Sequence, residues 1–251
     1  MNLRDLSATA DVPAAHAHAY IISFRKLGFI EQDPSTGQYR LGPFAMRLGV
    51  ARLRSDRALT LGSEAARDLC LELGVTVTLA VWGCGAPTVL EVQEGLEEIN
   101  INLREGRVFS VAATVTGRVF AAFGDPAPIK ERLALELARR SHQPSAETRS
   151  FMAEYRSAVA LARKQGYLQA VGIALPGVTA IAVPVLDVAG EMLYALTLVG
   201  REDNLDTSSH GRPVRALLAK SKAITEALRG AQVIGTKPGA DTTVRRAAVR
   251  S

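Results

Sequence analysis

The chain has 251 residues, of which 47% are apolar, and it carries 30 Lys and Arg against 25 Asp and Glu. This apolar content is sufficient for the core of one large or two small domains, which excludes general disorder. Glycines and prolines interrupt the two longest uncharged runs, Leu73–Leu90 and Leu168–Leu186, so neither predicts a membrane-spanning helix. No apolar segment follows a basic start at the N-terminus, so we expect no secretory signal, no membrane contact and a cytoplasmic location.

The excess positive charge lies near the two ends of the chain. Residues 1–60 carry eight basic and five acidic residues, residues 61–229 carry 18 and 19, and residues 230–251 carry four and one. A polyanion would therefore meet the ends, although this excess is also within ordinary surface variation. Cys70 and Cys84 are expected to be unpaired thiols, and none of the four histidines lies near a cysteine, so no metal and no cofactor are expected.

Helical periodicity followed by a hairpin characterises the first forty residues. Apolar residues recur at helical spacing from Leu3 to Ala10 and again from Pro13 to Leu27, where Gly28 ends the second helix. A short strand, a turn and a second strand are then expected at 29–33, 34–37 and 38–41. Two helices with a tight turn, followed by a hairpin, describe a winged helix-turn-helix.

The rest of the chain alternates helices and strands. Phe44 begins a predicted connecting helix that ends near Ala58, and a final amphipathic helix starts near Val214. Strands that meet at hairpins, with helices grouped between them, indicate an α+β domain with a mostly antiparallel sheet. Between these two helices we expect helices at 59–73, 116–123, 128–141 and 146–165, and strands at 75–82, 88–93, 99–104, 178–186 and 192–199.

Three stretches resemble the IclR family of bacterial transcription regulators in order and spacing. Leu3–Gly42, with the segment LGFIEQDPSTGQYRLG, resembles the family's DNA-binding domain. Val111–Phe123 and Gly177–Gly200, together with the dipeptide Gly166-Tyr167, resemble its GAF-like effector-binding domain. We therefore expect a winged helix-turn-helix at 1–42, a connecting helix at 43–58, an α+β effector-binding domain at 59–229 and, from its composition, a disordered tail at 230–251.

Two departures from the family pattern concern the DNA-binding domain. The family carries another helix before the one that starts at Leu3, and this chain begins after that position, so either the start site is misassigned or the domain lacks its first helix. Leu6, Ile21 and Leu27 would then lack an apolar packing partner. Ala19 stands where the family commonly has an arginine, which removes a phosphate contact.

The expected DNA contacts come from the second helix and the hairpin. Base-edge contacts are expected from the N-terminal half of the helix, and phosphate contacts from the basic residues that flank it. For the histidines the alternative is a polar, solvated face. Arg40 is the expected phosphate or minor-groove contact of the hairpin. The predicted DNA-binding residues are His16, His18, Tyr20, Arg25, Lys26, Gln38 and Arg40.

The start of the helix predicted near Thr116 is the expected effector site. N–H groups at a helix start bind a carboxylate without needing a charged side chain. In the IclR family this turn binds an effector carboxylate through backbone N–H groups, which by position implies Val115 and Thr116 as donors, with Gly117 beside them. Simple helix capping by Thr114 or Thr116 is the alternative, and it is compatible with ligand binding.

The resemblance also identifies four positions that hold small carboxylates in one branch of the family, as an Asp, a Cys and two Ser. Ala170, Ala180, Thr197 and Val199 stand there in this chain, so a small polar effector would bury unpaired groups at a cost of roughly 1–3 kcal/mol each. An aromatic or aliphatic carboxylic acid is favoured instead. The expected apolar wall residues, each of which could equally be plain core, are Trp82, Ile101, Leu103 and Ile181.

The expected function is a DNA-binding transcription regulator that responds to an aromatic or apolar carboxylic acid. Its expected partners are operator DNA, the effector and further copies of the chain in a homodimer or homotetramer. The alternative is a stand-alone small-molecule-binding protein whose DNA-binding domain has degenerated. An enzyme is less favoured, because Asp125, His142 and Ser145 lie in no nucleophile elbow and no basic residue adjoins Cys84.

Overall fold

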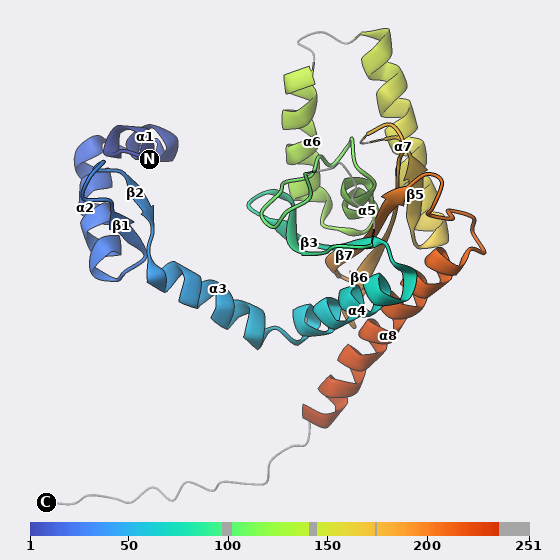
Figure 1. The fold of residues 1–251 in the computed structure, drawn as a ribbon. Helices are drawn as coiled ribbons and strands as arrows, with labels where there is room; N and C mark the ends of the chain where they lie inside the picture. The colour runs from blue at the N-terminus through green and yellow to red at the C-terminus, as the bar shows by residue number, and fades with distance from the viewer. Residues whose placement is uncertain (97–101, 141–144, 174, 236–251) are drawn as a thin grey trace, which may run out of the picture. The chain divides into compact units, whose positions relative to one another are not determined.

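The computed structural model describes residues 1–96, 102–140, 145–173 and 175–235. The chain forms two compact units, Met1–Thr60 and Leu61–Ser251 (Figure 1). Within the described ranges, no helix combines the length and the apolar character needed to cross a membrane.

The first unit contains three helices around a short hairpin. Helix α1 (Leu3–Ala10) begins at a capping box. The Asn2 side chain accepts the Asp5 N–H, and the Asp5 side chain accepts the Asn2 N–H. Helix α2 (Ala14–Lys26) leads into strands β1 (Ile30–Gln32) and β2 (Tyr39–Leu41), which pair antiparallel. Helix α3 (Pro43–Ser55) follows and has a proline at its start. The predicted helices and hairpin of this unit are confirmed.

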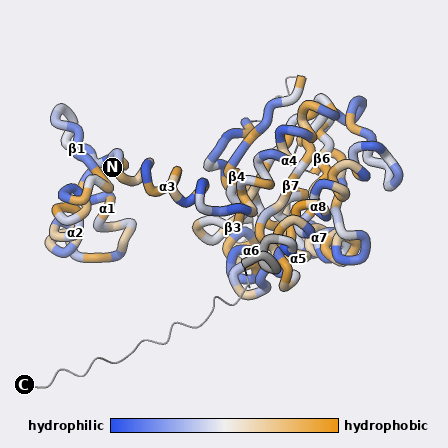
Figure 2. Tube along the Cα trace, turned by 90° about the horizontal axis from the view of Figure 1, so that it is seen from below, coloured by the Kyte–Doolittle hydropathy of each residue, from blue (hydrophilic) through white to orange (hydrophobic). Residues whose placement is uncertain are grey.

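Little of the first unit is buried. Ala17 and Ile21 of α2 are buried, and the rings of Phe29 and Phe44 pack edge to face with their centroids 4.7 Å apart. Neither α1 nor α3 contains a buried residue. Apolar and polar residues alternate along α3 (Figure 2). The unit therefore exposes much of the apolar surface that its helices carry.

The second unit is built on a five-stranded antiparallel sheet with the strand order β4-β3-β7-β6-β5. Strands β3 (Thr76–Gly83) and β4 (Ala86–Gln93) form one hairpin, and β6 (Val178–Leu186) and β7 (Met192–Arg201) form another. Strand β5 (Leu168–Val171) is the edge strand beside β6. The predicted α+β fold with a mostly antiparallel sheet is confirmed.

Side chains alternate between the two faces of this sheet, and different helices pack against each face. One face, called here the α5 face, packs against α5 (Val115–Phe123), which α6 (Pro126–Arg140) and α7 (Ala146–Gln165) flank (Figure 1). The other, called the α4/α8 face, packs against α4 (Arg57–Leu73) and α8 (Arg212–Gly235). An ion pair of 2.5 Å between Lys220 Nζ and Asp68 Oδ2 joins these two helices.

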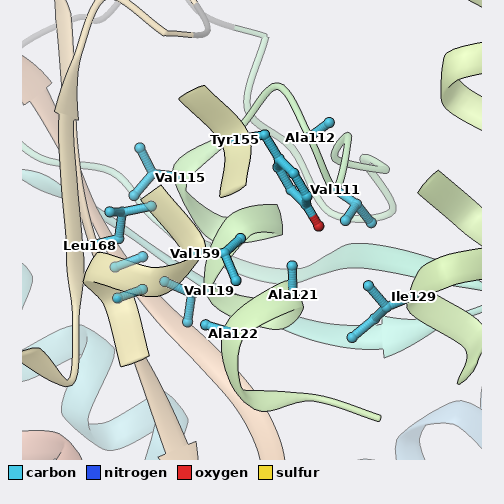
Figure 3. Packing of buried hydrophobic residues seen from close by; sticks show 12 residues of the cluster. Val111, Ala112, Val115, Val119, Ala121, Ala122, Ile129, Tyr155, Val159 and Leu168 are labelled. Carbon is cyan, nitrogen blue, oxygen red and sulfur yellow. The ribbon is translucent and has the colours of Figure 1, made fainter. Parts of the chain in front are cut away.

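Helix α5 is enclosed by the core, and every residue from Val115 to Ala122 is buried. Its apolar side chains pack against α7 and β5, including Tyr155, Val159 and Leu168 (Figure 3). A helix that is apolar on most of its faces is stable only in such a position, and its polar side chains, Thr116 and Arg118, are hydrogen-bonded. The start of α5 is therefore held in place by the packing of the whole unit.

Three predicted features differ from the structure. Strand β5 was not expected, because four residues carry too little alternation to identify an edge strand. The strand expected at 99–104 is wrong for 102–104, which lie in no strand, whereas 99–101 lie outside the described residues; Val108 instead forms a bridge to Thr88 of β4. The disordered tail expected at 230–251 is wrong for 230–235, which continue α8 because no proline or charge run ends it; residues 236–251 lie outside the described residues.

Gly117 lies where α5 passes closest to the turn before it. A Cβ at this position would lie 2.1 Å from the Ser110 carbonyl oxygen and 2.6 Å from Val111 Cα, and backbone atoms cannot rotate aside. Gly117→Ala should therefore lower the free energy of unfolding by about 1–3 kcal/mol, although alanine favours helices. Urea denaturation measures the change.

Gly230→Ala in α8 is the matched control, because a Cβ there would have no neighbour within 4 Å. It should leave stability unchanged or raise it by up to ~1 kcal/mol. Equal stability of the Gly117→Ala variant and the wild type would show that the turn before α5 moves aside at no cost.

Candidate effector site and DNA-binding surface

Side chains fix the turn 110–114 that precedes α5. The Glu136 carboxylate of α6 accepts the N–H groups of Val111 and Ala112 at 2.9 and 3.2 Å, and it accepts the Ser110 hydroxyl at 2.6 Å. The turn thus already binds one carboxylate through its backbone, and that carboxylate belongs to the protein. Its neighbouring donors form the candidate site.

Most N–H groups from the turn into the first turn of α5 have partners. Those of Thr114, Val115 and Thr116 have none among the described residues. Unpaired N–H groups at the start of a helix bind a carboxylate readily. The hydrogen bonds that use the other donors run from Ala113 N–H to Ser110 Oγ (2.9 Å), from Gly117 N–H to Thr114 Oγ1 (2.9 Å) and from Arg118 N–H to the Thr114 carbonyl oxygen (3.0 Å).

Arg118 holds the same turn from the opposite side. The residue is only 1% exposed; its Nε donates to the Ala112 carbonyl oxygen at 2.8 Å and its Nη1 pairs with Glu154 of α7 at 2.9 Å. The backbone of Ala112 therefore donates to an anion and accepts from a cation. Charge-assisted hydrogen bonds of this kind are stronger than neutral ones, so the turn is rigidly placed.

The charges around the turn are well defined. Burial raises the pKa of Glu136, but hydrogen bonds from Ser110, Val111 and Ala112, together with Arg132 at 3.0 Å, outweigh burial and hold that pKa below its ordinary value. Glu136 is therefore ionised near neutral pH. Burial and the nearby Glu136 charge raise the pKa of Tyr155, whose ring lies beside the turn (Figure 3), so its phenol stays neutral.

The α5 face of the sheet places the four positions identified from the family close together. Ala170 of β5 pairs with Ala180 of β6, which pairs with Val199 of β7. Thr197 lies on the same face in the next row, and its Oγ1 is 2.9 Å from Thr116 Oγ1, with both residues buried. Three apolar residues and one hydroxyl therefore lie beside the start of α5.

The four residues expected to form the apolar wall do not all lie on the α5 face. Trp82 lies on the α5 face, with its ring centroid 5.8 Å from that of Phe120. Leu103 is half-buried outside any strand, and Ile101 lies outside the described residues. The prediction for Ile181 is wrong: it alternates with Ala180 and Ala182 along β6, so it faces α4 and α8 instead.

On the first unit, the predicted DNA-contacting residues of α2 are exposed. His16 and His18 point to nearly opposite sides, because neighbours two residues apart in a helix differ by about 200°. Arg25 and Lys26 lie in its last turn, where cations also stabilise the helix dipole. Tyr20 is also exposed, and it lines an apolar groove together with Arg40.

This groove, of about 660 Å³, lies between α1, α2 and the hairpin. Its open side includes Tyr20, which is 62% exposed, and Leu41, which is 78% exposed. Leu6 and Ile21, two of the residues expected to lack a packing partner, line it. The full lining is Met1, Leu6, Ala10, Val12, Ala17, Tyr20, Ile21, Phe24, Ile30, Tyr39, Arg40 and Leu41.

The hairpin carries the remaining predicted contacts. Gln38 is exposed, and Arg40 Nε pairs with Glu31 Oε1 across the strands at 2.7 Å, with both side chains largely solvated. Such a surface pair is weak and a phosphate can displace it. At the tip, hydrogen bonds from Ser35 and Thr36 lower the pKa of Asp33 to about 2, so the turn carries a fixed negative charge.

A model of the C-terminal part of the bacterial transcriptional regulator IclR matches residues 59–226, which include every element of the α5 site. The chain belongs to the IclR family. The glycerol operon regulatory protein of Streptomyces coelicolor is 24% identical over 213 residues, which cover 85% of this chain and 82% of that protein.

Two solved structures extend the comparison to both units. Pseudomonas aeruginosa HmgR has a TM-score of 0.60 at 30% identity and covers 91% of this chain and 90% of its own. An IclR homologue from Microbacterium hydrocarbonoxydans, solved in complex with 4-hydroxybenzoate, has a TM-score of 0.67 at 24% identity and covers 92% of each chain. Transcription regulation and DNA binding are the shared functions of the IclR family, and the Streptomyces relative is by name a regulatory protein.

Three residues that shape the site in this IclR-family chain were not predicted. Arg118 and Glu136 act through backbone groups of the turn, and Thr78 of β3 lies on the α5 face directly opposite Thr197. The signal for Thr78 was present, since Thr76 and Thr78 alternate with apolar residues along a buried strand. Nothing in the local sequence marks Glu136. Within the described residues, no group of three or more His, Cys, Asp or Glu could hold a metal ion.

Glu136→Gln should destabilise the protein and remove part of its acid sensitivity. The pKa of Glu136 in the folded protein lies below its unfolded value of about 4.5, so the ionised group stabilises the fold above that pH, and this contribution is lost as pH falls through the folded-state pKa. We expect a loss of about 1–3 kcal/mol at pH 7 and a smaller difference from wild type at pH 3. Urea denaturation at the two pH values measures both.

The control for this change is Glu131→Gln, an exposed position on the same helix, which should have little effect. A Glu136→Gln penalty that is the same at pH 3 and pH 7 would contradict the assignment of an ionised, hydrogen-bonded carboxylate.

Proposed function

We propose that this IclR-family chain is a DNA-binding regulator whose DNA affinity responds to a carboxylic acid with an apolar body, bound at the start of α5. The observation that carries the proposal is the distribution of backbone donors. The N–H groups of Ala113 and Gly117 are used by side chains, whereas those of Thr114, Val115 and Thr116 between them are left without a partner among the described residues. The effector carboxylate is the partner that this arrangement fits.

The apolar row beside these donors supports an apolar body for the effector. Ala170 and Ala180 are half-buried, Val199 is buried, and the two alanines pack against the same cluster as Val115. A glyoxylate or pyruvate would bury its further polar atoms against these residues without hydrogen bonds. The 4-hydroxybenzoate complex of the Microbacterium relative supports the same class, a carboxylate on an apolar ring.

DNA recognition by the first unit requires two copies of the chain. One short helix with exposed His16 and His18, Arg25 and Lys26 supplies few base and phosphate contacts. A homodimer or homotetramer would place two such helices on half-sites about 34 Å apart or a multiple of it. Effector and DNA then influence each other only if the effector binds one arrangement of the assembly better, with a reciprocal coupling of about 1–3 kcal/mol.

Selection from a random duplex library by the full chain, with and without 4-hydroxybenzoate, tests this function. We expect a near-palindromic sequence to be enriched and its affinity to change with the acid. Calorimetry should then show the same factor for the effect of that DNA on the affinity for the acid. Binding of both ligands without any coupling would contradict the regulatory mechanism.

A stand-alone effector-binding protein is the second candidate, and the exposed groove of the first unit favours it. Apolar surface of this size on a small unit is a source of instability. The pairing of Arg40 with Glu31 further reduces the positive charge available to DNA. Failure of the random library to enrich any sequence, while acids still bind, would support this candidate.

Val115→Pro tests the carboxylate site with little strain. Proline suits the first position of a helix, and the preceding residue Thr114 has φ −130° and ψ 150°, which a following proline permits. The variant lacks one of the three unpaired donors, so its affinity for benzoate should fall about tenfold, as expected for a charge-assisted hydrogen bond, and its affinity for the neutral amide should fall less. Calorimetry measures both ligands.

Ala146→Pro, at the first position of α7 after the N-cap Ser145, is the matched control and should leave both affinities unchanged. Equal losses for the acid and the amide in Val115→Pro would show that the substitution acts on packing rather than on an anion site.

Two substitutions on the first unit separate phosphate contacts from base contacts. Arg40→Ala should weaken binding to all duplexes alike and reduce the slope of log affinity against log salt concentration by about one. His16→Ala should instead change the preference among duplexes. Glu31→Gln, which frees Arg40, should strengthen binding to all duplexes. Fluorescence titrations at several salt concentrations measure these effects. Identical behaviour of Arg40→Ala and His16→Ala would refute the assignment of Arg40 to phosphate contacts and of His16 to base contacts.

A further inference from the structure

Thr78 is a buried hydroxyl without a hydrogen bond on the α5 face of the sheet. The residue is 0% exposed, and its Oγ1 has no partner in the described structure. Buried hydroxyls are nearly always paired, because an unpaired one is destabilising. An unpaired hydroxyl close to a candidate binding site indicates a partner that is present only when a ligand is bound.

The position of Thr78 relates it directly to the start of α5. It lies opposite Thr197 on the neighbouring strand β7, so their Cβ atoms are about 4.5–5.5 Å apart. Thr197 in turn hydrogen-bonds Thr116, the residue that carries one of the unpaired N–H groups. Three hydroxyls from β3, β7 and α5 therefore gather beside the donors proposed for the effector carboxylate.

The three hydroxyls differ in what they can still bind. Thr116 and Thr197 share a hydrogen bond of 2.9 Å, which uses one donor of the pair. Thr78 retains both its donor and its acceptor capacity. Among the neighbours on this face, Ala170, Ala180 and Val199 offer no polar side-chain atom, and Thr76 Oγ1 already accepts the Gly95 N–H at 3.1 Å. Thr78 is thus the polar contact that remains for a second polar atom of a ligand.

We propose that Thr78 hydrogen-bonds a hydroxyl group of the effector and thereby selects carboxylic acids that carry a hydroxyl on their apolar body. This inference rests on the proposed function, because it uses the start of α5 as the carboxylate site. An acid without the hydroxyl leaves Thr78 unpaired, as it is in the free protein. An acid with the hydroxyl pairs both groups and gains affinity from each.

Calorimetry on the full chain tests the inference with benzoate, 3-hydroxybenzoate and 4-hydroxybenzoate as probes. The hydroxylated acid that fits the distance from α5 to Thr78 should bind the wild type more tightly than benzoate does. Thr78→Val, which keeps the shape of the side chain, should weaken that acid about tenfold and leave benzoate unchanged. Thr78→Val should also raise the melting temperature of the free protein, because it removes an unpaired buried hydroxyl.

Thr179→Val is the matched control. Thr179 is also 0% exposed with an unpaired Oγ1, but it alternates with Ala180 along β6 and faces α4 and α8. This variant should raise the melting temperature in the same way and leave all three affinities unchanged. A change in ligand preference confined to Thr78→Val would therefore report contact with the ligand rather than stability.

Each other result overturns the inference in a recognisable way. Equal losses for benzoate and its hydroxylated forms in Thr78→Val, or no loss for any, would refute the hydroxyl contact and leave the carboxylate site intact. The same loss in Thr179→Val would assign the effect to stability. Failure of the wild type to bind any of the three acids would refute the hydroxyl contact together with the proposed function.

Discussion

The placement of one residue's backbone determines the geometry of the candidate site. Ala112 donates its N–H to the Glu136 carboxylate and accepts the Arg118 guanidinium on its carbonyl oxygen, and Arg118 is almost fully buried. Removing either Glu136 or Arg118 would leave a buried charge or peptide group unpaired, so the turn is stable only with both partners in place. Because these bonds exist without a ligand, the donors at Val115 and Thr116 are already oriented, and an anion that binds there orders little of the chain.

The two faces of the sheet differ in the size and polarity of their side chains. The α4/α8 face carries large aliphatic side chains such as Leu79, Leu196 and Leu198, all fully buried, which fill the space to the helices. The α5 face carries alanines and threonines from the same strands, so α5 approaches closely and hydroxyls remain in the core. A ligand bound beside the start of α5, as proposed, would therefore meet short side chains and hydroxyls, which form directional hydrogen bonds, whereas the α4/α8 face presents mainly close-packed aliphatic side chains.

Sequence patterns predicted the elements well where apolar residues repeat over several turns or alternate over eight or more residues, as in α7 and β6. They failed for β5, whose four residues show no clear period. They also failed to place Ile181, because strand alternation assigns a face only once it is known which face of the sheet meets α5. Val115 and Thr116 could be identified by position because a helix start is a local feature. Glu136 could not, since its role depends on Val111, which lies 25 residues away in the chain. Alternation along β3 marks Thr78 as a polar residue of a buried strand, but its place beside the site depends on Thr197, more than 100 residues away.

The DNA-binding unit poses a different physical problem from the effector domain. It buries Ala17 and Ile21 in α2 but no residue of α1 or α3, and an open apolar groove separates its elements. DNA binds only the folded unit, so the measured affinity for DNA equals the intrinsic affinity of the folded unit multiplied by the fraction of molecules in which that unit is folded. Osmolytes that favour burial raise the folded fraction without adding contacts. An affinity that rises with osmolyte therefore identifies a unit limited by folding, whereas an affinity that stays weak identifies a recognition surface that has lost its contacts.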